Sequence, residues 1–218
     1  MRFDILTLQR SIPLMSLVPM LLAGLVAALT YRQQPANLRA VAWLLAFAIP
    51  LNLLGVVFAL QHRNNLFLMP IDLVGEFALL AVIYARTLQT PWFTRLLPVL
   101  IAGFAAYVGL DTWLGADLAL FRPGPQVVGC LLQMLLVGLY YRKLLKELHV
   151  THLHRDPMFW VSAGLLVYAA GSLQIALFSN FLLHYSQQLT LRIWAINSLL
   201  FAALYCCYTR ALWISPRN

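Results

Sequence analysis

One apolar run of the sequence, Met69-Pro-Ile-Asp-Leu-Val-Gly-Glu-Phe-Ala-Leu-Leu-Ala-Val-Ile-Tyr84, still carries two carboxyl groups, Asp72 and Glu76. With its flanks, this run is long enough to span a bilayer as a helix. The two acids are four residues apart, so a helix places them one turn apart on the same face. Ionisable groups inside a membrane span are costly and by default mark function. The stretch therefore predicts a membrane fold and the place to look for a site.

The composition of the whole chain is also strongly apolar. Its 218 residues are 62% hydrophobic and 10% charged, and the mean hydropathy is +0.80. Soluble domains carry about 25% charged residues, so the composition predicts an integral membrane protein without a separate soluble domain. The net charge is +8. The basic residues stand between apolar runs, as membrane orientation requires, and form no patch that would bind nucleic acid.

Seven apolar runs have the length of membrane-spanning helices. The connections between them are short, which favours a compact antiparallel bundle. The predicted fold class is therefore all-α, a polytopic membrane protein with one seven-helix domain over residues 1–218. The first run follows Met1-Arg2, but it is long for a signal peptide and has no clear cleavage site, so it is kept as a span. The predicted spans are residues 11–31, 40–61, 66–85, 96–114, 126–141, 157–181 and 193–213.

Lys and Arg residues are unevenly distributed between the two sides of these spans. Ten of the 15 fall on the side that holds the C-terminal tail and the connections after the first, third and fifth spans. The side richer in Lys and Arg is cytoplasmic. The sequence therefore predicts an N-terminus outside and a C-terminus in the cytoplasm.

Three of the spans end alike on the predicted cytoplasmic side. Tyrosine at the level of the lipid headgroups, with arginine just beyond it, is the expected pattern of a membrane interface. This interpretation is favoured over an internal repeat. The three endings are Tyr84-x-Arg86, Tyr140-x-Arg142 and Tyr208-x-Arg210.

The sixth span has a well-defined start and follows a cluster of histidines. Asp156-Pro157 predicts an N-cap and a proline at the first helical position. Three histidines can bind zinc or copper, but the spacing of His149, His152 and His154 fits no metal-binding helix motif and the neighbouring Arg155 would repel a cation. A solvated loop is the favoured interpretation, and no metal or cofactor is predicted.

The three cysteines also fall inside apolar runs. Cys206 and Cys207 are adjacent and point to different helix faces, and Cys130 lies in the fifth span. We expect all three to be small buried apolar residues.

The polar residues inside the spans gather in the middle and outer parts of the bundle. Glu76 lies about ten residues into its helix from the outside, roughly 15 Å at the helical rise, which is near the bilayer midplane. Asp72 is one turn closer to the outside. This distribution predicts a polar cavity that opens outward, with Glu76 at its floor. The candidate ligand-binding residues are Glu76, Asp72, Asn52, Gln133, Gln174, Asn197 and His184.

A carboxyl group at the depth of Glu76 must be protonated, paired or hydrated, because desolvation opposes its charge. No Lys or Arg lies at a matching depth. One interpretation is a protonated Glu76 that hydrogen-bonds neighbouring helices and holds them together. The other, which the general behaviour of intramembrane acids favours, is a group that binds a ligand or a proton. A retinal pigment is excluded because the seventh span has no lysine.

Several short motifs resemble a class of bacterial seven-helix membrane modules. They are Glu76-Phe77 with Tyr84-x-Arg86 in the third span, Asp156-Pro157-x-Phe159-Trp160 in the sixth and Trp194-x-x-Asn197 in the seventh. In some bacteria similar modules precede sensor histidine kinase domains, and others stand alone. The resemblance implies a membrane input module of the bacterial inner (cytoplasmic) membrane. This chain ends at Asn218 without a kinase domain, so a signal is expected to pass to a partner.

Three functions are open. The first is a stand-alone sensory or ligand-binding module that takes a small molecule or lipid from the outer side and signals to a cytoplasmic protein. The second is a small transporter with Glu76 as proton or cation coupler, although Leu200 occupies the matching place in the seventh span and repeats usually keep the site on both halves. The third is a lipid-modifying enzyme that uses Glu76 or Asp72 with His184 as acid and base. His184 is expected near the outer surface and Glu76 near the midplane, too far apart for this chemistry, so an enzymatic role is the least favoured.

Overall fold

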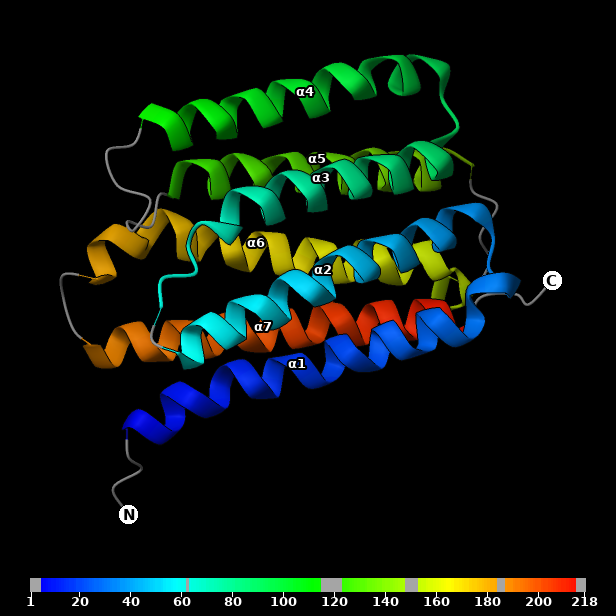
Figure 1. The fold of residues 1–218 in the computed structure, drawn as a ribbon. Coiled ribbons are helices and arrows are strands. Elements are labelled where there is room, and N and C mark those ends of the chain that lie inside the picture. Colours follow the sequence, from blue (N-terminus) through cyan, green and yellow to red (C-terminus); the bar gives the residue numbers. More distant parts are fainter. Residues whose placement is uncertain (1–4, 62, 115–122, 148–152, 184–186, 215–218) are drawn as a thin grey trace.

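The computed structural model of the chain describes residues 5–61, 63–114, 123–147, 153–183 and 187–214. Within these ranges it contains seven α-helices, two short 3-10 turns and no strand, which confirms the predicted all-α bundle (Figure 1). The elements are α1 (Ile5–Thr30), η1 (Tyr31–Gln33), α2 (Ala36–Leu60), α3 (Leu68–Leu88), α4 (Pro91–Leu114), α5 (Pro123–Glu147), η2 (Leu153–Arg155), α6 (Pro157–Leu183) and α7 (Gln187–Ile214).

The helices have the length and apolar composition that a bilayer requires. Six of them, α2 to α7, contain a stretch long and apolar enough to cross a membrane. Within α1 and η1, Leu17–Gln33 is a shorter apolar segment. The chain is therefore a multi-pass membrane protein.

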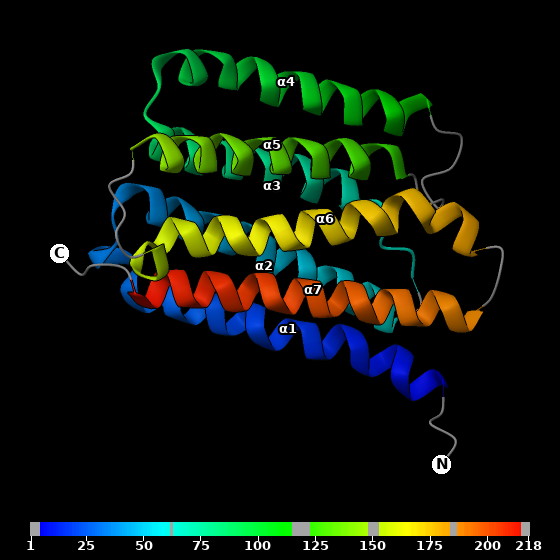
Figure 2. The same cartoon turned by 180° about the vertical axis from the view of Figure 1, so that it is seen from behind.

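Six of the helices form a closed cycle of contacts. In this ring α1 packs on α2, α2 on α3, α3 on α5, α5 on α6, α6 on α7, and α7 returns to α1. Helix α4 lies outside the ring, against α3 and α5 (Figures 1 and 2). Helices α1 and α7 begin at the same end of the bundle and end at the other (Figure 1). Helix α3 therefore stands in the ring with neighbours on three sides, which places its polar face next to other helices.

The start of α6 is as predicted. The Met158 backbone N–H donates to Asp156 Oδ1 over 2.9 Å, and the helix begins at Pro157. These contacts confirm the N-cap and the proline at the first helical position. The second oxygen of the same carboxylate, Oδ2, accepts the Tyr140 hydroxyl at 2.6 Å. Asp156 therefore also ties the end of α5 to the start of α6.

The end of α3 is held by a lysine from α5. Gln89 follows the helix in the left-handed conformation, with φ of 53°, which is a common way to terminate a helix. The Lys143 ammonium group donates to the carbonyl oxygens of Thr87 and Leu88 at 3.1 and 3.0 Å. These carbonyls belong to the last turn of α3, where a positive charge is favourable. The predicted cytoplasmic ends of α3 and α5 are thus joined.

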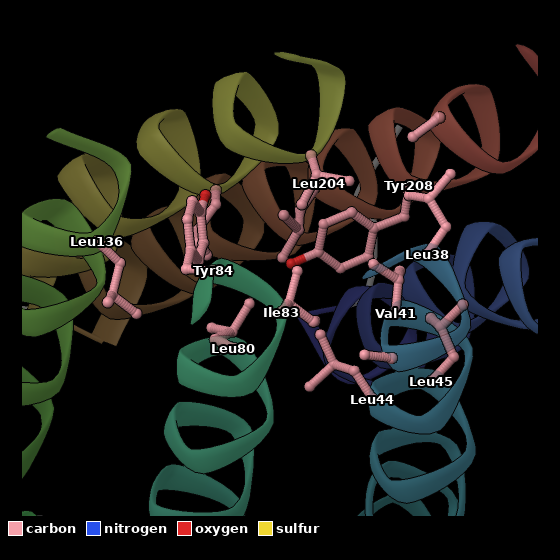
Figure 3. Packing of buried hydrophobic residues seen from close by; sticks show 14 of the residues in the cluster. Leu38, Val41, Leu44, Leu45, Leu80, Ile83, Tyr84, Leu136, Leu204 and Tyr208 are labelled. Atoms are coloured by element: carbon pink, nitrogen blue, oxygen red, sulfur yellow. The ribbon is translucent and has the colours of Figure 1, made fainter. Parts of the chain in front are cut away.

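The tyrosines of the three repeated endings face the interior of the bundle. Tyr84, Tyr140 and Tyr208 are 0%, 4% and 1% exposed, so their side chains pack inside the bundle, and their predicted depth at the headgroup level stays a prediction. Figure 3 shows the Tyr208 ring reaching from α7 toward Ile83 on α3. A tyrosine at this level can be buried because its hydroxyl finds partners on neighbouring helices, as those of Tyr84 and Tyr140 do.

The arginines of these endings are exposed, as the interface pattern requires. Arg86 donates to the carbonyl oxygen of Ala36 at 2.9 Å. Arg210 stacks over Trp160, with its guanidinium carbon 5.3 Å from the ring centroid. The basic side chains therefore stand at the surface of the bundle end while the tyrosines fill its core.

Packing differs between the two halves of the bundle. The half on the predicted cytoplasmic side holds the fully buried side chains of α3, among them Phe77, Leu80, Ile83 and Tyr84. No described side chain in residues 49–76 of α2 and α3, or in residues 193–203 of α7, is buried. The predicted outer halves of α2, α3 and α7 therefore keep accessible surface on every face.

Two glycines set the distance between helices near this outer half. At Gly75, next to Glu76, a Cβ atom would overlap the ring of Phe47 on α2. At Gly171 of α6, a Cβ atom would overlap the side chain of Leu200 on α7. Small residues at such contacts let helices approach closely in a membrane. They fix α2 against α3 and α6 against α7 on either side of the polar interior.

The cysteines only partly follow the expectation of burial. Cys130 is buried, Cys207 is partly buried and Cys206 is exposed, so the expectation is wrong for Cys206. Adjacent residues point to different faces of a helix, and Cys206 lies on the exposed face of α7. Of the histidine cluster, His149 and His152 lie outside the described residues, while His154 is exposed in η2 and its carbonyl accepts the Trp160 indole N–H at 3.0 Å.

Candidate functional site

The centre of the candidate site is the carboxyl group of Glu76 on α3. The side chain of Gln133 on α5 hydrogen-bonds to it, and Asp72 lies close enough for the two acids to act on each other electrostatically. The surrounding helices desolvate both carboxyl groups, yet both residues keep partial exposure. The two acids therefore form one electrostatic unit on a face of α3 that neighbouring helices cover incompletely.

Gln133 is the most buried member of the predicted set. It is 4% exposed, and its Oε1 atom is buried without a hydrogen-bond partner among the described residues. An amide can donate two hydrogen bonds and accept others at its oxygen, so the bond to Glu76 uses only part of its capacity. A buried carbonyl left unpaired costs about 1–3 kcal/mol. The amide oxygen is thus a place where a hydrogen-bond donor would be stabilised.

Three tyrosines from α6 and α7 lie within electrostatic range of Glu76. They are Tyr168, Tyr205 and Tyr208. The Tyr205 and Tyr208 ring centroids are 5.6 Å apart. The Tyr208 hydroxyl has no hydrogen-bond partner among the described residues, although the residue is only 1% exposed. Tyr208 Oη is therefore, after Gln133 Oε1, a second buried polar atom of this interior without a partner among the described residues.

These tyrosines were not among the residues that the sequence indicated. A signal for them exists in α7, because Phe201, Tyr205 and Tyr208 are spaced as one face of a helix requires. Their rings do pack together, with 4.5 Å between the centroids of Phe201 and Tyr205. Within an apolar span such aromatics are ordinary core residues, so spacing alone does not connect them to Glu76 on another helix.

The remaining predicted ligand-binding residues differ in their contacts with the surroundings of Glu76. Asn197 of α7 is linked indirectly: the Ser172 hydroxyl donates to its Oδ1 atom over 3.4 Å, and Ser172 also hydrogen-bonds Tyr168. Asn52 bonds within its own helix, donating to the Ala48 carbonyl oxygen at 3.0 Å. Gln174 is exposed, and His184 lies outside the described residues.

A second set of polar contacts lies between the site and the predicted cytoplasmic end. Tyr208 belongs to both sets, because it lies within electrostatic range of both Glu76 and Tyr84. The Tyr84 and Ser162 hydroxyls are 2.9 Å apart, and the Tyr84 ring lies edge-on to Tyr140 with 6.4 Å between centroids. Tyr140 in turn donates to Asp156. Buried hydroxyls thus continue from the level of Glu76 to the start of α6.

The chemistry of this arrangement is that of a binding site for a proton or a hydrogen-bond donor. It offers carboxylate, amide and phenol oxygens in a desolvated interior, where electrostatic interactions are strong. The described residues contain no group of three or more His, Cys, Asp or Glu side chains that could hold a metal ion. Comparisons with models of known protein families, with curated proteins and with solved structures found no match to this chain, so the site itself is the basis for assigning a function.

Proposed function

We propose that this chain is a sensory module of the bacterial inner membrane that binds a ligand beside Glu76 and passes a signal to a cytoplasmic partner. The observation that carries the proposal is the buried amide oxygen Gln133 Oε1, which has no partner among the described residues although its side chain bonds the Glu76 carboxyl group. A second buried atom without a described partner, Tyr208 Oη, lies in the same bundle interior. More than about 90% of buried polar groups have a hydrogen-bond partner. The exception at Gln133, beside a desolvated acid, is accounted for if a bound molecule supplies the missing partner.

The unequal packing of the bundle supports access from the predicted outer side. The outer halves of α2, α3 and α7 contain no buried side chain among those described. Asp72 is one turn nearer to that end than Glu76, and it is partly exposed as well. A ligand would meet Asp72 first and Glu76 below it, above the tightly packed cytoplasmic half.

The contacts below Glu76 support a route for the signal. Ligand binding would change the charge or the hydrogen bonds of Glu76, which lies within electrostatic range of Tyr208. Tyr208 lies near Tyr84, which is bound to Ser162 of α6. The start of α6 is tied to α5 by Tyr140 and Asp156. The end of α5 and the start of α6 would therefore form the surface where a cytoplasmic partner detects the change.

The test is a comparison of signalling by wild-type protein and the Glu76→Gln variant in the native host. We expect a cytoplasmic protein to be captured by in vivo crosslinking to the wild-type chain, and its output, measured by transcript profiling against a deletion strain, to change in Glu76→Gln. Asp111→Asn on α4 is the matched control, because it removes a helix acid outside the ring. An output identical to wild type in Glu76→Gln, with equal amounts of folded protein, contradicts the proposal.

The rival functions predict different results. A transporter would accumulate a substrate in vesicles under a pH gradient, and uptake lost in Glu76→Gln would replace the sensory proposal. A structural Glu76 would be protonated and would donate to Gln133, whose amide would turn its oxygen toward the acid. In that case Glu76→Gln would lower stability and leave every output unchanged.

A further inference from the structure

We infer that the start of α2 and the end of α3 together bind the phosphate headgroup of an anionic phospholipid from the surrounding bilayer. Arg39 and Arg86 would hold the phosphate, and Trp43 would pack against the lipid one helical turn deeper in the membrane. This site is separate from Glu76 and goes beyond the proposed function. Three features carry the inference: two arginines anchored side by side, a connection that fixes them, and the exposed face of α2 beneath them.

Two arginines from different helices are anchored to one short segment of backbone. Arg39 Nε donates to the carbonyl oxygen of Gln34 at 2.7 Å, and its Nη2 atom donates to that of Arg32 at 3.4 Å. Arg86 Nη1 donates from α3 to the carbonyl oxygen of Ala36 at 2.9 Å. Gln34 and Ala36 are two residues apart in the chain, so their Cα atoms are separated by at most about 7 Å. The two guanidinium groups therefore share one small part of the surface.

Both guanidinium groups keep hydrogen-bond donors for a further acceptor. A guanidinium carries five N–H donors, of which Arg39 uses two and Arg86 uses one in these bonds to carbonyl oxygens. Both side chains are exposed. The planar fork of N–H groups matches the oxygens of a phosphate. Two neighbouring positive charges also repel each other, and a phosphate bound between them would remove that repulsion.

The connection between α1 and α2 is fixed by the buried side chain of Gln34, which is 2% exposed. Its Nε2 atom donates to Thr30 Oγ1 at 3.0 Å and to the carbonyl oxygen of Leu212 on α7 at 2.9 Å. The Thr30 hydroxyl donates in turn to the carbonyl oxygen of Val26 at 2.7 Å. The arginines thus bond to a backbone that α1 and α7 hold in place. Donors that are ordered before binding lose less entropy when a ligand arrives, which favours binding.

The face of α2 that carries Arg39 continues into the membrane. Trp43 follows Arg39 by four residues, so the two side chains share a face, and Trp43 is 59% exposed. Its ring lies edge-on to Tyr31, with 6.4 Å between the ring centroids. Tryptophan and tyrosine are typical of the headgroup level of a membrane, and α2 is apolar enough to cross one. An anion held by Arg39 and Arg86 would have the apolar face of α2 beside it, which fits a phospholipid better than a soluble anion or an acidic protein.

The test compares lipids on the full chain in dodecylmaltoside micelles. Thermal unfolding is followed by tryptophan fluorescence while dioleoylphosphatidylglycerol is added. The matched additives are dioleoylphosphatidylcholine, which has the same acyl chains and no net charge, glycerol 3-phosphate and sodium phosphate. We expect a saturable rise of the melting temperature with phosphatidylglycerol alone, since a ligand that binds the folded state stabilises it. The apparent affinity should fall as salt is added, because salt screens exposed charges.

Variants locate the bound lipid. Arg39→Gln and Arg86→Gln should each lower the apparent affinity for phosphatidylglycerol about fivefold, and the double variant about twentyfold, as expected for basic residues that attract anionic lipid. Arg95→Gln is the matched control, because it removes an exposed arginine from the start of α4, which lies at the same end of the bundle (Figure 1). It should bind the lipid as the wild type does. If Arg39→Gln does not fold, Arg86→Gln, which loses a single described bond, tests the site alone.

Three results would overturn the inference. Phosphatidylcholine could stabilise the protein as much as phosphatidylglycerol, which would show no preference for an anionic headgroup. Glycerol 3-phosphate or sodium phosphate could match the lipid, which would make the site one for a soluble anion. Arg86→Gln could bind phosphatidylglycerol like the wild type, or Arg95→Gln could lose as much affinity as Arg86→Gln, which would show a general attraction of charges without a site at Arg39 and Arg86.

Discussion

The hydroxyl oxygens of Tyr84 and Ser162 lie 2.9 Å apart, and both residues are 0% exposed. Tyr84 follows Glu76 by eight residues on α3, which is about two helical turns and the same face. The face of α3 that carries the acids therefore continues directly into a fixed polar contact with α6. Any displacement of α3 that follows binding at Glu76 must move or break this contact.

The Tyr84–Ser162 contact should stabilise the bundle measurably. Tyr84→Phe and Ser162→Ala should each lower the free energy of unfolding by about 1–3 kcal/mol, because each leaves a buried hydroxyl unpaired. The double variant should lose less than the sum, with a coupling energy of about 0.6 kcal/mol and at most about 1.7, the range for such contacts in membranes. Unfolding in mixed micelles at increasing SDS measures all four proteins. Strictly additive losses would show that the two hydroxyls are not bonded.

Tyr208→Phe should behave in the opposite way. Its hydroxyl is buried and has no hydrogen-bond partner among the described residues, so its removal should leave the melting temperature unchanged or raise it. Signalling should fall at the same time, because stability and function often compete at a binding site. The matched comparison is Tyr84→Phe, in which the same atom is removed from a bonded tyrosine. A loss of stability equal to that of Tyr84→Phe would reveal a partner for Tyr208 and remove one of the two unpaired atoms.

Gly171 and Gly75 should tolerate no added methyl group. Gly171→Ala should destabilise the protein by about 1–3 kcal/mol, because its Cβ would overlap Leu200 and overpacking strains neighbouring side chains. Gly75→Ala should have a similar effect and should also weaken binding at the adjacent Glu76. Gly103→Ala on α4 is the control: its Cβ would meet nothing within 4 Å, so it should be neutral or gain up to about 1 kcal/mol of helix propensity. Equal melting temperatures for all three variants would contradict the close approach of the helices.

Asp156 should have two separable roles. Asp156→Ala should lower the free energy of unfolding by about 1–3 kcal/mol through loss of the helix cap and of the Tyr140 bond. Asp156→Asn keeps an oxygen for the Met158 N–H and should lose less. In a Tyr140→Phe background the effect of Asp156→Ala should shrink to that of the cap alone, near 1 kcal/mol. Chemical unfolding of the four variants measures this, and an undiminished effect would show that the Tyr140 bond is not formed in the membrane.

The orientation derived from the basic residues is open to direct measurement. In a protein whose three cysteines are replaced by alanine, Asn64→Cys in the connection before α3 should react with a membrane-impermeant maleimide added to intact spheroplasts. Lys146→Cys at the end of α5 should react only after permeabilisation, since its end of the bundle is predicted to be cytoplasmic. The reversed pattern of labelling would invert the topology and place the opening of the site on the cytoplasmic side.

How far the sequence predicts this molecule can be seen along α3. The apolar run around Asp72 and Glu76 was sufficient to predict a spanning helix, and the Asp156-Pro157 pair predicted the start of α6, because both signals are local. The burial of Tyr84, Tyr140 and Tyr208 was not predictable, since a tyrosine at a helix end suits an interface equally well. Which helices surround Glu76 depends on the order of the ring, and no local pattern encodes that the aromatic face of α7 lies near α3.

Binding of a ligand beside Glu76 is tested most directly by a high-resolution electron cryomicroscopy structure of the full chain in lipid nanodiscs. A bound molecule is predicted within hydrogen-bond distance of the Glu76 carboxyl group, in contact with Gln133 Oε1 or Tyr208 Oη. Direct packing of these three side chains on one another, with Gln133 Oε1 bonded to a protonated Glu76, would contradict the claim and make Glu76 a structural residue.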